Sequence, residues 1–111
     1  MIKKLNLETG SPNTQDAIQK LKNSLSTFKR QGCKAVVVIH GYGASGVGGS
    51  IKTAVRVCLR ERSMVGIVRM TVSGEDWVDR KREAISICSA LATHEREIAG
   101  NSGVTVVVLR N

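Results

Sequence analysis

Aromatic residues are scarce in this 111-residue chain, which contains one phenylalanine, one tyrosine and one tryptophan. Proteins that bind single-stranded nucleic acid by base stacking need several exposed rings, so the composition argues against a stacking platform. Hydrophobic residues still make up 41% of the sequence, so the core must be built from aliphatic side chains. That fraction suits one globular domain and argues against disorder.

Long apolar runs and paired cysteines are also lacking. No run approaches the ~20 residues needed to cross a bilayer, and no signal peptide is recognisable, so we expect no membrane partner and a cytoplasmic location. Cys33, Cys58 and Cys88 are odd in number and form no CxxC pair. This pattern favours buried free thiols over a redox or zinc site.

Acidic residues are few in the first half of the chain. Residues 1–62 contain eleven lysines and arginines against three acids, whereas residues 63–111 contain six of each. The whole formal excess of +8 therefore lies in the first half. A polyanionic partner is one interpretation, and a solvated basic face without a partner is the other. Charge alone leaves both open.

The hydrophobic patterns predict an alternation of strands and helices. Strands are expected at residues 3–7, 34–39, 66–72 and 104–109. We expect Asn13 to cap a first helix that ends at Gly32, and Ser50 to cap a second helix. Residues 75–99 are less regular and are expected to form one helix or two short pieces. The order β-α-β-α-β-(α)-β predicts an α/β fold with helices packed on a small mixed sheet.

A glycine-rich stretch, "HGYGASGVGGS", joins the second strand to the second helix. Its GxGxxG spacing fits a dinucleotide-binding turn, but the required acid is missing from the next strand, because Glu61 lies at the end of the helix instead. A P-loop does not fit either, because Gly49 stands where the phosphate-binding lysine is needed.

A phosphate site remains the best interpretation of this stretch. Free backbone N–H groups and the positive end of a helix dipole would face one point. Lys52 and Arg56 are four residues apart and share one helix face. We expect the His40 ring to emerge beside this turn, where it would contact phosphate, act as a general acid or base, or cap the loop through a backbone hydrogen bond.

Metal and cofactor sites are not predicted. Three nearby acids could in principle hold a divalent cation, but acids at a helix N-terminus more often serve as capping and dipole partners. These are Glu75, Asp76 and Asp79.

Several segments together resemble the Smr (small MutS-related) domain family. "VVVIHGYGASGVGGSIKTAVRVCLRE" is similar to the family's strand, His-Gly-x-Gly turn and following helix, and "SGVTVVVL" is similar to its terminal strand. "LNLETGSPNTQDAIQKL" occupies the place of the opening strand and first helix. The longer glycine-rich turn and the "GEDW" segment resemble small stand-alone Smr proteins of Gram-positive bacteria. The resemblance covers nearly the whole chain.

The resemblance implies one domain over residues 1–111, with a partly helical insert at about 74–101. It implies a two-layer sandwich of two main helices on a mixed four-stranded sheet, similar to the C-terminal domain of translation initiation factor three. It also implies binding of DNA or RNA, with endonuclease nicking in some members. The HGxG residues correspond to His40, Gly41 and Gly43.

The family's LDxH motif departs from its usual form in this chain, where Asn6 and Glu8 replace its aspartate and histidine. A neutral amide cannot act as a base, and an ionised carboxylate cannot donate a proton. Whether the protein is an enzyme therefore stays open, with three catalytic candidates: His40, Glu8 and Asn6.

Phosphate binding does not depend on that motif, because cations and backbone amides supply it. The predicted phosphate-binding residues are Gly41, Gly43, Ser45, Gly46, Gly48, Gly49, Lys52, Arg56, Arg60 and Lys34. The sequence thus predicts a nucleic-acid-binding protein that holds backbone phosphate at this turn. The alternative is a non-catalytic adaptor or a module that binds a small anion or nucleotide.

Overall fold

The computed structural model describes residues 1–10, 13–41 and 47–110, with the backbone alone at residues 47–49. Four strands form one sheet in the order β1-β2-β4-β3. Strand β2 is parallel to β1 and antiparallel to β4, which is also antiparallel to β3. The mixed sheet expected from the sequence is confirmed. The strands are β1 (Ile2–Asn6), β2 (Ala35–Ile39), β3 (Val68–Ser73) and β4 (Val104–Leu109).

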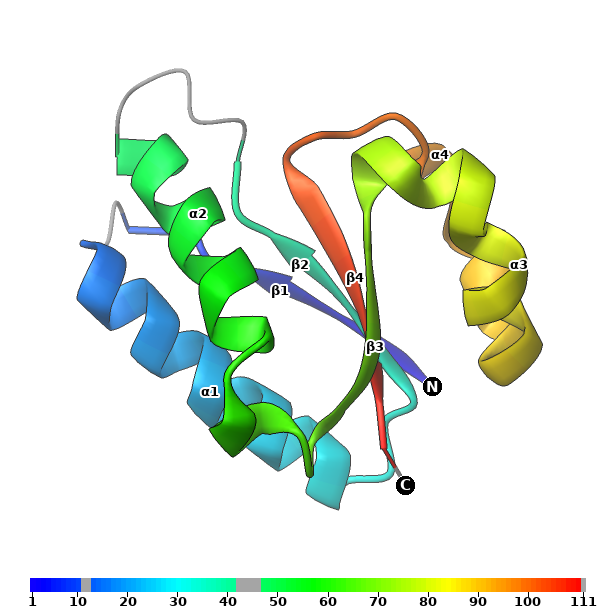
Figure 1. The fold of residues 1–111 in the computed structure, drawn as a ribbon, viewed down its shortest axis with the longest axis horizontal. Helices are drawn as coiled ribbons and strands as arrows, with labels where there is room; N and C mark the ends of the chain where they lie inside the picture. The colour runs from blue at the N-terminus through cyan, green and yellow to red at the C-terminus, as the bar shows by residue number, and fades with distance from the viewer. Residues whose placement is uncertain (11–12, 42–46, 111) are drawn as a thin grey trace.

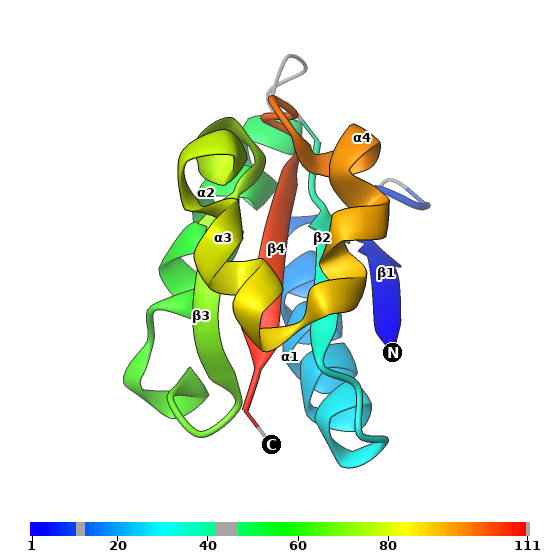
Figure 2. The same cartoon turned by 90° about the vertical axis from the view of Figure 1, so that its right-hand side faces the viewer.

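Helices cover both faces of this sheet. Helices α1 (Thr14–Arg30) and α2 (Val47–Leu59) lie on one side, and α3 (Trp77–Ile87) and α4 (Glu95–Ile98) lie on the other (Figure 1). Figure 2 shows the second layer in front of the sheet. The segment expected to be irregular therefore forms short helical pieces that supply a further layer, beyond the two main helices on the first face.

The two central strands are apolar on both faces because each face meets a helical layer. In β2, Val36 and Val38 pack towards α1 and α2, whereas Ala35 and Val37 pack towards α3 and α4. Strand β4 alternates in the same way, and all six of its residues are buried. The continuous valine runs of the sequence therefore correspond to strands enclosed between two cores.

The first helix begins and ends as its sequence predicts. The Asn13 side chain accepts a hydrogen bond from the Asp16 N–H at 2.8 Å, which satisfies a free donor of the first turn. Gly32 follows the helix with φ +81°, the left-handed conformation that glycine adopts readily.

The second helix begins earlier than expected. It starts at Val47, so Ser50 lies inside its first turn and is not its cap. Gly48 and Gly49 take helical backbone, although glycine is a weak helix former and the sequence favoured a loop there. The packing of Ile51, Val55 and Cys58 into the core holds the rest of this helix.

The three cysteines are buried and free, as expected. In the described part of the chain, no helix combines the length and the apolar character needed to span a membrane.

The ends of all four strands meet at one end of the sheet. Strands β1, β2 and β3 finish there and β4 starts there, because β4 runs opposite to the other three. The aligned pairs at this end of the sheet are Asn6 with Ile39, Ile39 with Val104, and Ser73 with Thr105. Residues that are far apart in the sequence, before α1, after β2 and after β3, therefore meet at the end of the sheet.

Candidate nucleic-acid interface

Glu8 and Gly41 lie against each other at the end of the sheet where β1 and β2 finish. A Cβ on Gly41 would collide with the Glu8 carboxylate, and the φ of Gly41 is +84°. Both the contact and the backbone conformation therefore require glycine at this position. The structure thus brings a residue of the altered LDxH motif next to the His-Gly turn.

The same turn is fastened to the start of β4. The N–H groups of His40 and Gly41 both donate to the Gly103 carbonyl, at 2.9 and 3.1 Å. The Gly103 N–H in turn donates to the Asn101 side chain at 2.9 Å. The "SG" that precedes the last strand is therefore part of the support for the turn.

The His40 ring is buried, contrary to the expectation that it would emerge beside the loop. Its Nδ1 lies 3.0 Å from the Gly41 carbonyl and its Nε2 lies 2.9 Å from the Thr105 hydroxyl. Because a carbonyl only accepts, Nδ1 carries a proton, and in the neutral ring Nε2 therefore accepts from the Thr105 hydroxyl. The ring thus makes the backbone hydrogen bond that was one of the alternatives, and it also ties β2 to β4.

The environment of His40 favours its neutral form. Burial lowers the pKa of His40, and the positive charges of Arg56 and Lys52 lower it further. The hydrogen bond to Gly41 and the Glu75 charge act in the opposite direction without reversing the shift.

The two cations of α2 meet a carboxylate from the other side of the sheet. Arg56 donates to Glu75 at 2.6 Å, and the Lys52 ammonium lies 3.5 Å from the same side chain. Glu75 belongs to the single 3₁₀ turn η2 (Gly74–Asp76) that follows β3. Partial desolvation acts to raise the pKa of Glu75, but the charges and hydrogen bonds of Arg56 and Lys52 outweigh it and hold that pKa below its usual range.

Asn6 has a structural role at this end of the sheet. Its side-chain oxygen accepts from the Glu8 N–H at 2.8 Å, which fixes the turn that carries Glu8. Its carbonyl accepts from the Lys20 ammonium at 3.0 Å. Lys20 is thus a further cation near the site, and the sequence contained no signal for it because only the packing of α1 places it there.

The remaining predicted residues fall into three groups. Gly43, Ser45 and Gly46 lie outside the described residues. Gly48 and Gly49 lie in the first turn of α2, and Arg60 follows the helix directly. The structure does not bring Lys34 to this end of the sheet, because Lys34 precedes β2 whereas His40 follows β2. Lys34 lines a different cavity, together with Arg69.

The acids considered as metal ligands do not converge. Glu75 faces Lys52 and Arg56, and the Asp76 N–H is bound by the Ser73 hydroxyl at 3.2 Å. Among the residues that the structure describes, no group of three histidine, cysteine, aspartate or glutamate side chains could hold a metal ion.

Comparisons with known proteins agree with this architecture. The structure resembles the Smr domain of MutS2 from Thermus thermophilus with a TM-score of 0.62 and 20% sequence identity, covering 98% of this chain and 99% of that one. At this identity the likeness concerns the fold. A search among curated proteins finds no match. The Smr domain model matches residues 11–110, and the chain therefore belongs to the Smr domain family.

Proposed function

We propose that this Smr domain binds DNA or RNA by holding backbone phosphate between the His-Gly turn and the basic face of α2. Smr domains bind nucleic acid in general, and the placement of Lys52 and Arg56 carries the proposal for this chain. Lys52 extends from the second turn of α2 and Arg56 from its last turn, and the charges of both act on His40, which directly follows β2.

The start of α2 strengthens this attraction. The first N–H groups of a helix have no partner within the helix, and its N-terminus carries a partial positive charge. The helix begins at Val47, within the glycine-rich stretch. Phosphate held there would lie one turn from Lys52, so amides and an ammonium would act on the same group.

Glu75 sets the cost of binding. A phosphate that contacts Lys52 and Arg56 competes with the carboxylate that already pairs with them. An exposed ion pair is worth only ~0–1 kcal/mol, so exchange for a multidentate phosphate contact is favourable. Backbone contacts of this kind carry no sequence information, so we expect little sequence preference.

Binding to a panel of DNA and RNA structures across salt concentrations tests the proposal. The Lys52→Gln/Arg56→Gln variant should bind more weakly, and the slope of log K against log[salt] should flatten by about 1 for each phosphate that the variant no longer neutralises. The matched control is Lys34→Gln/Arg69→Gln, which removes two charges that line the other cavity. Undetectable or salt-independent binding by the wild type, or an equal effect of the control, would contradict the proposal.

A second candidate function is nicking of the bound strand, and the position of Glu8 against Gly41 is the observation that favours it. In this proposal Glu8 acts as the general base at the turn, while Asn6 fixes its backbone and buried His40 holds Gly41. Nicking of supercoiled plasmid and of structured RNA should be abolished in Glu8→Gln and His40→Ala. Equal activity of the wild type and Glu8→Gln would rule out this mechanism.

The alternative is an adaptor or small-anion module. Displacement of bound nucleic acid by a mononucleotide at micromolar concentration would favour it over the proposed function.

A further inference from the structure

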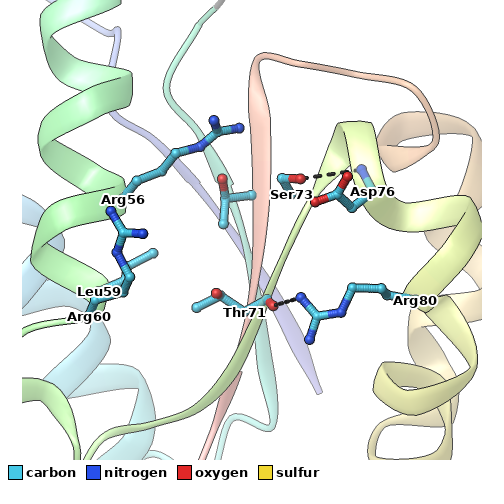
Figure 3. Close-up of a pocket in the computed structure, with 8 residues that line it drawn as sticks. Arg56, Leu59, Arg60, Thr71, Ser73, Asp76 and Arg80 are labelled. Atoms are coloured by element: carbon cyan, nitrogen blue, oxygen red, sulfur yellow. Dashed lines mark hydrogen bonds between the residues drawn. The ribbon is translucent and has the colours of Figure 1, made fainter.

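A pocket of about 210 Å³ lies beside the edge strand β3, between α2 and the start of α3. In Figure 3, Arg56 and Arg60 project from the α2 side, Arg80 reaches from α3, and Thr71 and Ser73 lie between them on the strand. Pockets for drug-sized molecules are ~300–1,000 Å³ and mostly apolar. This pocket is smaller, and its lining consists of three arginines, three residues with hydroxyl groups, Asp76 and the apolar Leu59.

The arginines are available to a ligand to different degrees. Among the described residues, none forms a hydrogen bond or ion pair with the Arg60 side chain, which is exposed. Arg80 donates to the Thr71 carbonyl at 3.0 Å and to Glu83 at 3.3 Å, so its guanidinium is held in place on the strand. Arg56 uses one nitrogen for Glu75. The planar guanidinium has five N–H donors, so Arg56 and Arg80 retain donors for a second partner.

Hydroxyl groups complete the lining. The Ser73 oxygen accepts from the Asp76 N–H, which leaves its own hydrogen free to donate. Thr105 lines the pocket and also donates to His40, so the pocket adjoins the buried ring beneath the His-Gly turn. Of the described residues that line the pocket, Asp76 is the one acid against three arginines. The lining therefore has a net positive charge and many donors, the chemistry that recognises a phosphate group.

We infer that this pocket is a second phosphate subsite, which takes a neighbouring phosphate of the nucleic acid strand bound at the His-Gly turn. The inference rests on the proposed function. Arg56 is common to the proposed phosphate site at the His-Gly turn and to the pocket, because it pairs with Glu75 beside Lys52 and also lines the pocket. A strand that leaves the turn would therefore pass over the edge of β3. The phosphate is either an internal phosphodiester or a terminal phosphomonoester.

Two substitutions with opposite expected effects test the pocket. Arg60→Gln should weaken binding of a short oligonucleotide several-fold and reduce the salt slope by about 1. Arg62→Gln removes the same charge two residues later, outside the pocket lining, and should have a smaller effect. Asp76→Asn should strengthen binding, because it removes the acid of the lining; the Asp76 side chain makes no capping hydrogen bond to α3. A gain of affinity cannot arise from damage to the fold.

Oligonucleotides with and without a 5′-phosphate distinguish a terminal phosphomonoester from an internal phosphodiester as the group bound in the pocket. An Arg60→Gln effect confined to the phosphorylated strand identifies a terminal phosphate, and an equal effect on both strands identifies a phosphodiester. Equal effects of Arg60→Gln and Arg62→Gln, with no gain in Asp76→Asn, would overturn the subsite while leaving the proposed function intact.

Titration of the ¹⁵N-labelled chain with inorganic phosphate provides a readout independent of nucleic acid. We expect amide shifts at Thr71 and Ser73 in the wild type that are reduced in Arg60→Gln. If the wild type binds no nucleic acid, the proposed function fails, and this titration alone decides whether the pocket binds phosphate. Absence of shifts at both residues would overturn the inference.

Discussion

The Glu75 carboxylate lies 2.6 Å from the Arg56 guanidinium and joins the turn after β3 to a helix on the opposite face of the sheet. It also lies 3.5 Å from Lys52, so one acid occupies both predicted phosphate-binding side chains. An acid in this position competes with any incoming phosphate.

Removing this competitor should strengthen binding. We expect Glu75→Gln to raise the affinity for nucleic acid about two- to fivefold at low salt, because an exposed ion pair is worth ~0.2–1 kcal/mol and no longer has to be exchanged. Equilibrium binding at two salt concentrations measures the effect. Glu61→Gln is the matched control, since Glu61 pairs with Lys22 at 3.6 Å instead of with the site cations. An equal gain in both variants would indicate a general charge effect.

The buried histidine predicts a stability that depends on pH. Because the pKa of folded His40 lies below its ordinary value of 6.5, the unfolded chain binds the proton first as the pH falls. The contribution of His40 is therefore complete above about pH 6.5 and diminishes as the pH falls towards the lowered pKa. We expect the Tm to fall between pH 7.5 and pH 5.

His40→Gln should reduce this pH slope, measured by thermal unfolding in matched buffers. His94→Gln is the control, because His94 lies on the surface segment that precedes α4 and pairs with Glu97 at 3.2 Å. Identical slopes in the wild type and His40→Gln would contradict the assignment of the titration to His40.

The Thr105 hydroxyl should contribute measurably to folding. Thr105→Val leaves the buried Nε2 of His40 without its donor, and an unsatisfied buried polar group costs ~1–3 kcal/mol. Urea unfolding should show a decrease of this size in the free energy of unfolding. Thr105→Ser retains the hydroxyl and should be less destabilising, so equal decreases would indicate that the hydrogen bond is not the cause.

Gly41 should tolerate alanine less well than another glycine with a similar backbone. Gly41→Ala combines a left-handed conformation, which costs ~1–2 kcal/mol, with a collision against Glu8. Gly100→Ala has φ +72° but meets no atom within 4 Å, so it measures the backbone cost alone. Denaturant unfolding should rank Gly41→Ala as the more destabilising.

The collision can be tested separately. Adding Glu8→Ala to Gly41→Ala should recover part of the stability, because the collision disappears while the backbone cost remains. If the double variant is no more stable than expected from adding the two single changes, the Glu8 contact does not limit this position.

Features with a local cause could be predicted from the sequence. The Asn13 cap and the Gly32 terminus depend on interactions within a few residues, and the valine runs of β2 and β4 need only an apolar environment on each face. These elements appear in the structure within one or two residues of their predicted positions.

Features that depend on tertiary contacts could not be predicted in the same way. The His40 ring can be buried because Thr105, 65 residues later, supplies the hydroxyl that donates to its Nε2. The pairing of Lys52 and Arg56 with Glu75 crosses from one helical layer to the other. The prediction of Lys34 as a phosphate-binding residue depends on its charge, and charge alone does not reveal at which end of a strand a residue lies.

The hydrogen bond from Arg80 to the Thr71 carbonyl has a consequence for self-association. Strand β3 is an edge strand, and an exposed edge can pair with a strand of another molecule. Arg80 occupies one backbone acceptor of β3 and places a positive charge beside it, which opposes such pairing. A change at Arg80 would therefore alter the solubility of the protein together with the proposed phosphate binding, and the two effects have to be measured in the same preparation.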